Sequence, residues 1–197
     1  MMVVFDLSGV FFTKGLNIAV HQISQKYNLE PDKVRFVLNG SFAHEYRTGQ
    51  IKGDSFWKKA KKELKVEDIY DIKTMFFDAY EPQQSTIDLI KRLKSKNISV
   101  AYLSNSPKDR VEYLDEKNQF LSLFDCGCFS FEANARKPEK EIYQKFLQKC
   151  RFDKTRIVYI DDDPRNLQPA KELGMETILY QDTRQLIYSL MKAGVEI

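Results

Sequence analysis

The chain is poor in cysteine, nearly neutral in net charge and without a long apolar run. Its 197 residues include three cysteines, an odd number, and the first apolar run, Val3–Phe5, ends at the acidic Asp6. This run is much shorter than the apolar segment of a secretory signal peptide. No other stretch approaches the roughly 20 residues needed to cross a bilayer. We therefore expect no leader, no membrane contact, and a cytoplasmic protein whose thiols are reduced.

Charge and cysteine spacing also exclude two common classes of site. Lysine plus arginine exceed aspartate plus glutamate by three, 31 against 28, which is too small an excess to indicate a nucleic-acid partner. The lysine-rich stretch 58–62 alternates with apolar residues at helical spacing, which predicts the solvated face of an amphipathic helix. Cys126 and Cys128 have no second pair at zinc spacing, so we interpret them as two thiols in a buried strand.

The apolar residues are numerous enough for a core and follow a clear order of elements. Hydrophobic residues make up 43% of the chain. A strand at 2–6 precedes a long stretch of helical patterns, after which strands and helices alternate, as in parallel sheets built from strand–helix–strand units. We predict an α/β fold, a doubly wound parallel sheet with a small inserted all-helical cap. Residues 1–14 and 82–197 would form the core, and residues 15–81 the cap.

Periodicity and capping residues set the expected boundaries of the elements. The predicted strands cover residues 2–6, 98–103, 126–131, 156–160 and 176–180. The predicted helices cover residues 16–27, 31–38, 42–47, 56–64, 68–80, 86–96, 107–117, 139–150, 164–173 and 183–192. Asp54 is expected to cap the helix that begins at Phe56, and Gly174 to end the helix before it in the chain.

Polar residues that could bind phosphate or a metal ion stand at the ends of four of the predicted strands or soon after them. They are Asp6, then Ser104 and Asn105, then Lys137, and then Asp161–Asp163. Ligands of parallel sheets bind beyond the carboxyl ends of the strands, so these groups would meet at one edge. Each has an ordinary explanation by itself: Asp6 or Ser104 as a cap, Lys137 as a solvated side chain, and the aspartates as complements of a helix dipole.

Together, the order, placement and types of these residues match one known pattern. Four segments carry it: Asp6-Leu-Ser-Gly-Val10, Ser104-Asn105, Lys137-Pro138, and the stretch from Ile160 to Gly174. The segments are spread along the chain, and through them the chain resembles the haloacid dehalogenase (HAD) superfamily from end to end. The segment from Tyr46 to Trp57 is similar to the helical cap of the subfamily that contains dehalogenases, sugar-phosphate phosphatases and the N-terminal phosphatase domain of soluble epoxide hydrolases. The tail after Asn166 resembles the last group in particular.

The resemblance implies a metal site and a covalent intermediate. Asp6 would attack phosphorus and carry an aspartyl-phosphate. Mg²⁺ would be held by the Asp6 carboxylate, the backbone carbonyl of Ser8, and Asp162, since it is a hard cation that takes oxygen ligands. Asp161 or Asn166 would act through water or orient these ligands.

The resemblance also implies how phosphate is bound. Lys137 would neutralise the nucleophile and a phosphoryl oxygen, while Ser104 and Asn105 with nearby backbone N–H groups would bind further oxygens. The implied substrate is a small phosphorylated metabolite, and the implied assembly is a monomer or a weak homodimer.

Ser8 departs from the family pattern. Family phosphatases carry an aspartate there, which protonates the leaving group and then activates water. General acid–base help contributes roughly 10²- to 10⁴-fold, so we expect slow turnover of poor leaving groups. Two alternatives stay open: a non-catalytic binding or regulatory protein, and a dehalogenase with Arg47 as the candidate halide ligand. His21 and His44 are expected at the surface or in packing.

Overall fold

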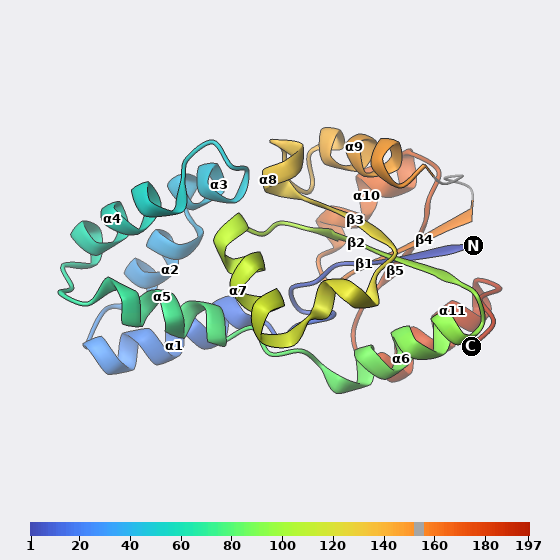
Figure 1. Cartoon of the computed structure of the whole chain (residues 1–197), viewed down its shortest axis with the longest axis horizontal. Helices are drawn as coiled ribbons and strands as arrows, with labels where there is room; N and C mark the ends of the chain where they lie inside the picture. The colour runs from blue at the N-terminus through green and yellow to red at the C-terminus, as the bar shows by residue number, and fades with distance from the viewer. Residues whose placement is uncertain (152–155) are drawn as a thin grey trace.

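The fold is built around a parallel sheet of five strands (Figure 1). The computed structural model describes residues 1–151 and 156–197. The sheet order is β3-β2-β1-β4-β5, and every neighbouring pair is parallel. The strands are β1 (Met2–Phe5), β2 (Ser99–Ser104), β3 (Cys126–Phe129), β4 (Ile157–Asp161) and β5 (Glu176–Leu179). The predicted doubly wound α/β fold is confirmed.

Helices connect these strands, and each predicted helix is present within a few residues of its expected ends. Between β1 and β2 the chain forms α1 (Gly15–Tyr27), α2 (Pro31–Asn39), α3 (Ser41–Arg47), α4 (Gly53–Leu64), α5 (Ile69–Asp78) and α6 (Gln84–Ser95). Later come α7 (Lys108–Asn118), the 3₁₀ helix η1 (Phe120–Leu123), α8 (Ser130–Ala133), α9 (Lys140–Cys150), α10 (Pro164–Glu172) and α11 (Thr183–Lys192). No helix in this described part of the chain is both long and apolar enough to cross a membrane.

Three local expectations were wrong. The helices η1 and α8 were not predicted, and β3 ends at Phe129 because Ser130 already begins α8. Asp54 does not cap α4; the helix begins at Gly53 and its N-cap is Lys52. Asp54 lies in the first turn instead, where a negative charge still complements the helix dipole.

Alternating side chains of the central strand divide the core between the two faces of the sheet. Val3 and Phe5 pack with the apolar residues of α6 and α11, whereas Val4 packs with α9 and the side chain of Tyr159. All four residues of β1 are buried, as expected for a strand covered by helices on both sides. Asp6, the residue that follows this strand, is buried as well.

Helices α1–α5 lie together beyond the carboxyl ends of the strands (Figure 1). Phe56 and Trp57 are buried among them and belong to the same continuous apolar cluster as Phe5 of the sheet. The lysines of stretch 58–62 are exposed while Ala60 is buried, so the predicted amphipathic face of α4 is confirmed.

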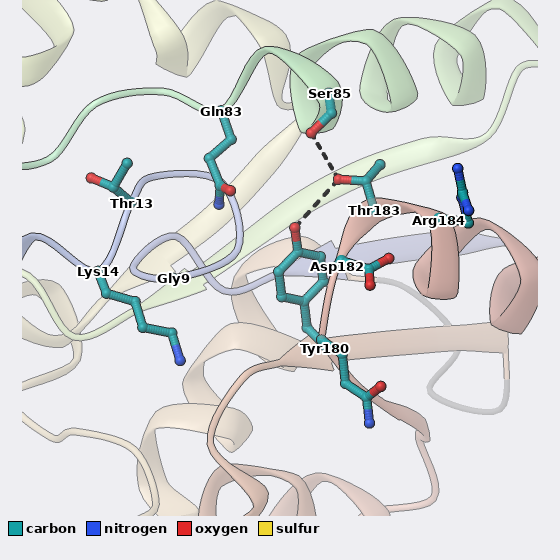
Figure 2. A pocket seen from close by; sticks show the side chains of 10 residues that line it. Gly9, Thr13, Lys14, Gln83, Ser85, Tyr180, Asp182, Thr183 and Arg184 are labelled. Carbon is teal, nitrogen blue, oxygen red and sulfur yellow. Dashed lines mark hydrogen bonds between the residues drawn. The ribbon is translucent and has the colours of Figure 1, made fainter.

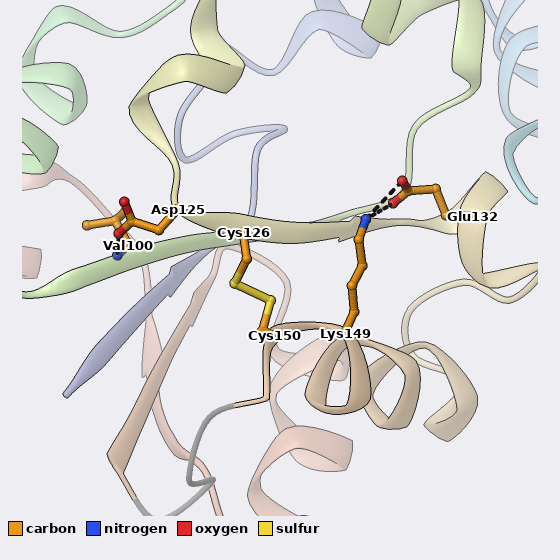
Figure 3. The surroundings of a disulfide bond; sticks show 6 residues. All are labelled: Val100, Asp125, Cys126, Glu132, Lys149 and Cys150. Carbon is orange, nitrogen blue, oxygen red and sulfur yellow. Dashed lines mark hydrogen bonds and ion pairs between the residues drawn. A yellow bond between two sulfur atoms is a disulfide. The ribbon is translucent and has the colours of Figure 1, made fainter.

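The expectation of reduced thiols was wrong for one pair of cysteines. Cys126 at the start of β3 is joined to Cys150 at the end of α9 by a disulfide (Figure 3). Cys128 is buried and is the free cysteine of the described chain. The partners are 24 residues apart, and only the packing of α9 on β3 brings them together.

Candidate active site

Acidic residues at the carboxyl ends of the neighbouring strands β1 and β4 lie close together. β1 pairs with β4 so that Phe5 lies opposite Ile160, and the Asp6 N–H donates to the Ile160 carbonyl at 2.8 Å. One carboxylate oxygen each from Asp6, Asp161 and Asp162 lies within 4.8 Å of the others. The chain passes from β1 to β2 on one side and returns to β4 on the other. Ligands bind at such a switch point in open α/β sheets.

Lys137 brings a buried positive charge into this group. Its Nζ lies 2.7 Å from Asp6 Oδ1 and 2.7 Å from Asp161 Oδ2. The Asn105 side chain holds the backbone of Lys137 from both sides, accepting from its N–H at 2.9 Å and donating to its carbonyl at 3.0 Å. Burial disfavours the ammonium, but the two carboxylates keep the pKa of Lys137 above its ordinary value. We predicted that Asn105 binds phosphate; in the structure, its side-chain amide is hydrogen-bonded to the backbone of Lys137 and positions that residue.

Asp161 is fully buried and its oxygens are occupied by donors. Lys137, the Tyr159 hydroxyl, the Asn166 side chain and the Asp163 N–H all donate to it. A carboxylate with this many donors is fixed in place. The arrangement suits the orienting role that the sequence predicts for Asp161 and Asn166.

Asp6 and Asp162 accept fewer hydrogen bonds from the protein than Asp161 does. Asp6 Oδ1 accepts from the Leu7 N–H at 2.7 Å and from Lys137, while no donor of the described residues reaches Oδ2. Asp162 pairs with the exposed Lys14 at 3.0 Å. Gly9 has φ +87°, and a Cβ there would stand 2.5 Å from Asp162 Oδ2. This oxygen-only donor set fits Mg²⁺, which is held through one or two carboxylates and keeps several waters.

Burial changes the acidity of the predicted nucleophile. Burial and the neighbouring Asp161 and Asp162 raise the pKa of Asp6 to about 7, against the lowering effect of Lys137. Without a further positive charge, the carboxyl group is therefore only partly ionised at neutral pH.

A chain of hydroxyls connects the end of β2 to an arginine that the sequence did not single out. Ser104 is fully buried, and its Oγ lies 3.1 Å from Ser106 Oγ. Ser106 Oγ accepts from Arg110 Nη2 at 3.0 Å. Arg110 lies four residues before the buried Leu114, which places it on the apolar face of α7. A charged residue on that face is unusual, and this signal in the sequence could have identified Arg110.

A cavity of about 610 Å³ opens over this site. Its lining includes Ser8 and Lys137 from the loops after the strands, Arg110 from α7, and His44 and Arg47 from α3. His44 thus faces the cavity. Its pKa is lowered, mainly by burial and to a smaller extent by the positive charges of Arg136 and Arg47. His21, by contrast, is exposed elsewhere, as expected.

A second cavity, of about 650 Å³, lies beside the loop after β1 (Figure 2). Several of its polar groups already have partners: Thr183 contacts the hydroxyls of Ser85 and Tyr180, and Asp182 caps α11 by accepting from the Gln185 N–H. Neither Asp6 nor Lys137 lines it. Lys137, which pairs with Asp6 and Asp161, lines the first cavity and not the second.

Comparison with known proteins agrees with this geometry. The model of the haloacid dehalogenase-like hydrolase family matches residues 3–180. The chain is 26% identical to an uncharacterized protein of Dictyostelium discoideum, over 91% of this chain and 90% of that protein. It is 23% identical to the sesquiterpene phosphatase astK of Aspergillus oryzae, over 87% and 85%. It is also 24% identical to the bifunctional epoxide hydrolase 2 of Sus scrofa, over 98% of this chain but 39% of that protein.

Solved structures show the same fold. A HAD family enzyme from Bacteroides thetaiotaomicron, in complex with magnesium and inorganic phosphate, aligns with a TM-score of 0.76 and 21% identity, over 94% of this chain and 98% of that one. A HAD-like family hydrolase from Porphyromonas gingivalis aligns with a TM-score of 0.78 and 18% identity, over 100% and 98%. The acidic cluster with its lysine at the strand ends, and the family match along nearly the whole chain, show that this protein belongs to the haloacid dehalogenase-like hydrolases.

Proposed function

We propose that the protein is an Mg²⁺-dependent phosphatase of a small phosphorylated metabolite, with Asp6 as the nucleophile. The observation that carries the proposal is that the two carboxylate oxygens of Asp6 differ. Oδ1 is contacted by the Leu7 N–H and by Lys137, while Oδ2 has no donor among the described residues and is free to attack phosphorus. A phosphatase among the relatives, and a structural neighbour that holds magnesium and phosphate, support the same reaction class.

The chemistry follows from this geometry in two steps. Asp6 Oδ2 attacks phosphorus, the bond between phosphorus and the ester oxygen breaks, and an aspartyl-phosphate forms. Water then attacks the same phosphorus, releases inorganic phosphate and restores the carboxylate. Asp6, Asp162 and the Ser8 carbonyl would hold Mg²⁺, which when bound offsets the charge between the carboxylate and a dianionic phosphate. Lys137 supplies a second, fixed positive charge.

Helices α1–α5 would act as a cap over this reaction. We assign residues 15–81 to the cap and residues 1–14 and 82–197 to the core, as the sequence indicates. His44 and Arg47 of α3 line the same cavity as Lys137, which supports a role for the cap in substrate contact and in excluding water.

The first test uses para-nitrophenyl phosphate, whose leaving group needs no acid. We expect phosphate release that is stimulated by Mg²⁺ and abolished by chelation. Asp6→Asn should lose this activity, because an amide cannot form the intermediate. An exposed control, Asp32→Asn in α2, should retain it. Absence of Mg²⁺-stimulated release by the unaltered protein would contradict the proposal.

Ser8→Asp separates a working enzyme from a protein that only binds phosphate. With an alkyl phosphate, whose leaving group needs a proton, we expect the variant to gain roughly 10²- to 10⁴-fold in kcat. With para-nitrophenyl phosphate the gain should be far smaller. No gain with either ester would favour the binding or dehalogenase alternative over the phosphatase.

A further inference from the structure

Two arginines of the cavity are buried without a carboxylate partner. Arg47 is 8% exposed and Arg110 is 2% exposed. Arg47 Nη2 donates to the Leu38 carbonyl at 2.8 Å, and Arg110 Nη2 donates to the Asn105 carbonyl and Ser106 Oγ. Within residues 1–151 and 156–197, Arg110 Nη1 is buried with no hydrogen-bond partner, and neither guanidinium forms an ion pair.

The other cations that line the cavity differ from these two. Lys137 pairs with Asp6 and Asp161, Arg136 pairs with Glu139, and Arg165 pairs with Asp163. Their charges are neutralised by the protein itself. The excess positive charge of the cavity therefore belongs to Arg47 and Arg110.

Leaving two such charges buried is unfavourable unless something else compensates for them. An unpaired buried charge or donor lacks the hydration it has in water. Burial and the neighbouring Arg110 lower the pKa of Arg47 to about 10. The Arg110 Cζ lies 4.1 Å from the centre of the Tyr80 ring, and this contact helps to hold the guanidinium in place.

We infer that the substrate carries a second oxyanion besides the transferred phosphoryl group, and that Arg110 and Arg47 bind it. The inference rests on the proposed phosphatase function and names the class of its substrate. A carboxylate or a second phosphate matches the planar donor fork of a guanidinium. A cavity of about 610 Å³ is large enough for a small metabolite with two charged ends. Because Arg47 comes from α3 and Arg110 from α7, the second anion would also bridge cap and core.

Two non-hydrolysable ligands test this in the unaltered protein, with Mg²⁺ present. 3-Phosphonopropionate ends in a carboxylate, and propylphosphonate ends in a methyl group. By calorimetry we expect the first to bind roughly 10- to 100-fold more tightly, the gain typical of hydrogen bonds to charged groups. Equal affinities would overturn the second anion site and leave the phosphatase proposal standing. No binding of either ligand would count against the phosphatase site itself.

A third ligand identifies the second anion. Ethane-1,2-bisphosphonate replaces the carboxylate by a second phosphonate on the same two methylene groups. A site for a carboxylate should prefer 3-phosphonopropionate, and a site for a second phosphate should prefer the bisphosphonate. Both results support the inference. If neither ligand with an anionic tail binds more tightly than propylphosphonate, the inference fails.

Arginine variants assign the preference to these residues. We expect Arg110→Gln to reduce the ratio of the two affinities to nearly one and Arg47→Gln to reduce it in part. Arg110→Lys, which keeps the charge without the fork, should retain an intermediate ratio. The exposed Arg92→Gln in α6 is the matched control and should keep the full ratio. Circular dichroism checks that each variant is folded; if Arg110→Gln is not, Arg110→Lys and the unaltered protein still decide the question. A full ratio in folded Arg110→Gln would contradict the assignment.

Discussion

Asp6 illustrates how strongly its surroundings change a single side chain. An aspartate ordinarily loses its proton near pH 4, but burial beside Asp161 and Asp162 raises the pKa of Asp6 to about 7. The same carboxyl group would have to be ionised to hold a cation and to attack phosphorus. In the proposed mechanism, protonation, metal binding and catalysis are therefore linked at this one residue.

This linkage predicts a pH-dependent affinity for Mg²⁺. A cation requires the ionised carboxylate, so binding must displace a proton wherever Asp6 is protonated, which is below about pH 7. We expect affinity to weaken by up to about tenfold per pH unit below that value and to level off above it. Calorimetry in two buffers of different ionisation enthalpy measures the released proton. An affinity that is constant from about pH 5.5 to 8 would contradict the linkage.

The position of Gly9 beside Asp162 leads to a second prediction about Mg²⁺ binding. Its φ is +87°, and an added Cβ would collide with Asp162 Oδ2. Gly194 has a similar φ of +77° but open space around it, so Gly194→Ala is a matched control. Both alanine variants should lose about 1 kcal/mol of unfolding free energy through backbone strain. Only Gly9→Ala should also displace Asp162 and weaken Mg²⁺ binding, as measured by calorimetry. Equal Mg²⁺ affinity in the two variants would exclude this steric role.

Among the elements, β3 and α9 depend on each other most visibly. β3 is an edge strand of four residues, and α9 packs across it. The disulfide between Cys126 and Cys150 joins the first residue of one to the last residue of the other (Figure 3). A covalent link at this position restrains the unfolded chain over the 24 residues that separate the cysteines.

Removing this link predicts a redox-dependent loss of stability. Cys150→Ser should lower the free energy of unfolding by about 3 kcal/mol in non-reducing buffer, as estimated from the length of the closed loop. The difference from the unaltered protein should largely vanish in a reducing agent. Cys128→Ala is the control, and its stability should still respond to the reducing agent. Urea unfolding under both conditions makes the comparison, and equal stabilities without reductant would exclude a stabilising disulfide.

For the whole molecule, the contact between the helices α1–α5 and the sheet is partly polar. Ser130 is fully buried; its hydroxyl donates to the Arg47 carbonyl at 2.6 Å and accepts from the Ser106 N–H at 3.1 Å. One hydroxyl thus connects the end of α3, the loop after β2 and the start of α8. Arg47 lines the cavity, and Ser106 contacts Arg110, which also lines it. We therefore expect this junction to help position the proposed cap relative to the core.

Ser130→Ala tests the junction. The substitution leaves a buried carbonyl and a buried N–H without their partner, which costs about 1–3 kcal/mol. We expect this loss in urea unfolding, together with a larger KM for the phosphatase substrate. Ser55→Ala, at an exposed position of α4, should change stability by less than about 0.5 kcal/mol. If Ser130→Ala changes the unfolding free energy and KM no more than Ser55→Ala does, the junction makes no measurable contribution to stability or substrate binding.

What the sequence by itself determined was the sheet, its order of elements and the residues at the ends of its strands. Strand and helix periodicity is a local property, and the rule that parallel strands end at one edge converts it into a shared location for Asp6, Lys137 and Asp162. The tertiary structure alone decided which carboxylate oxygens are occupied, that Asn105 holds Lys137, and that Cys126 reaches Cys150. It also decided that Arg110 and Arg47 share a cavity. These contacts join residues far apart in the chain, and they depend on side-chain packing between elements, which no local pattern encodes.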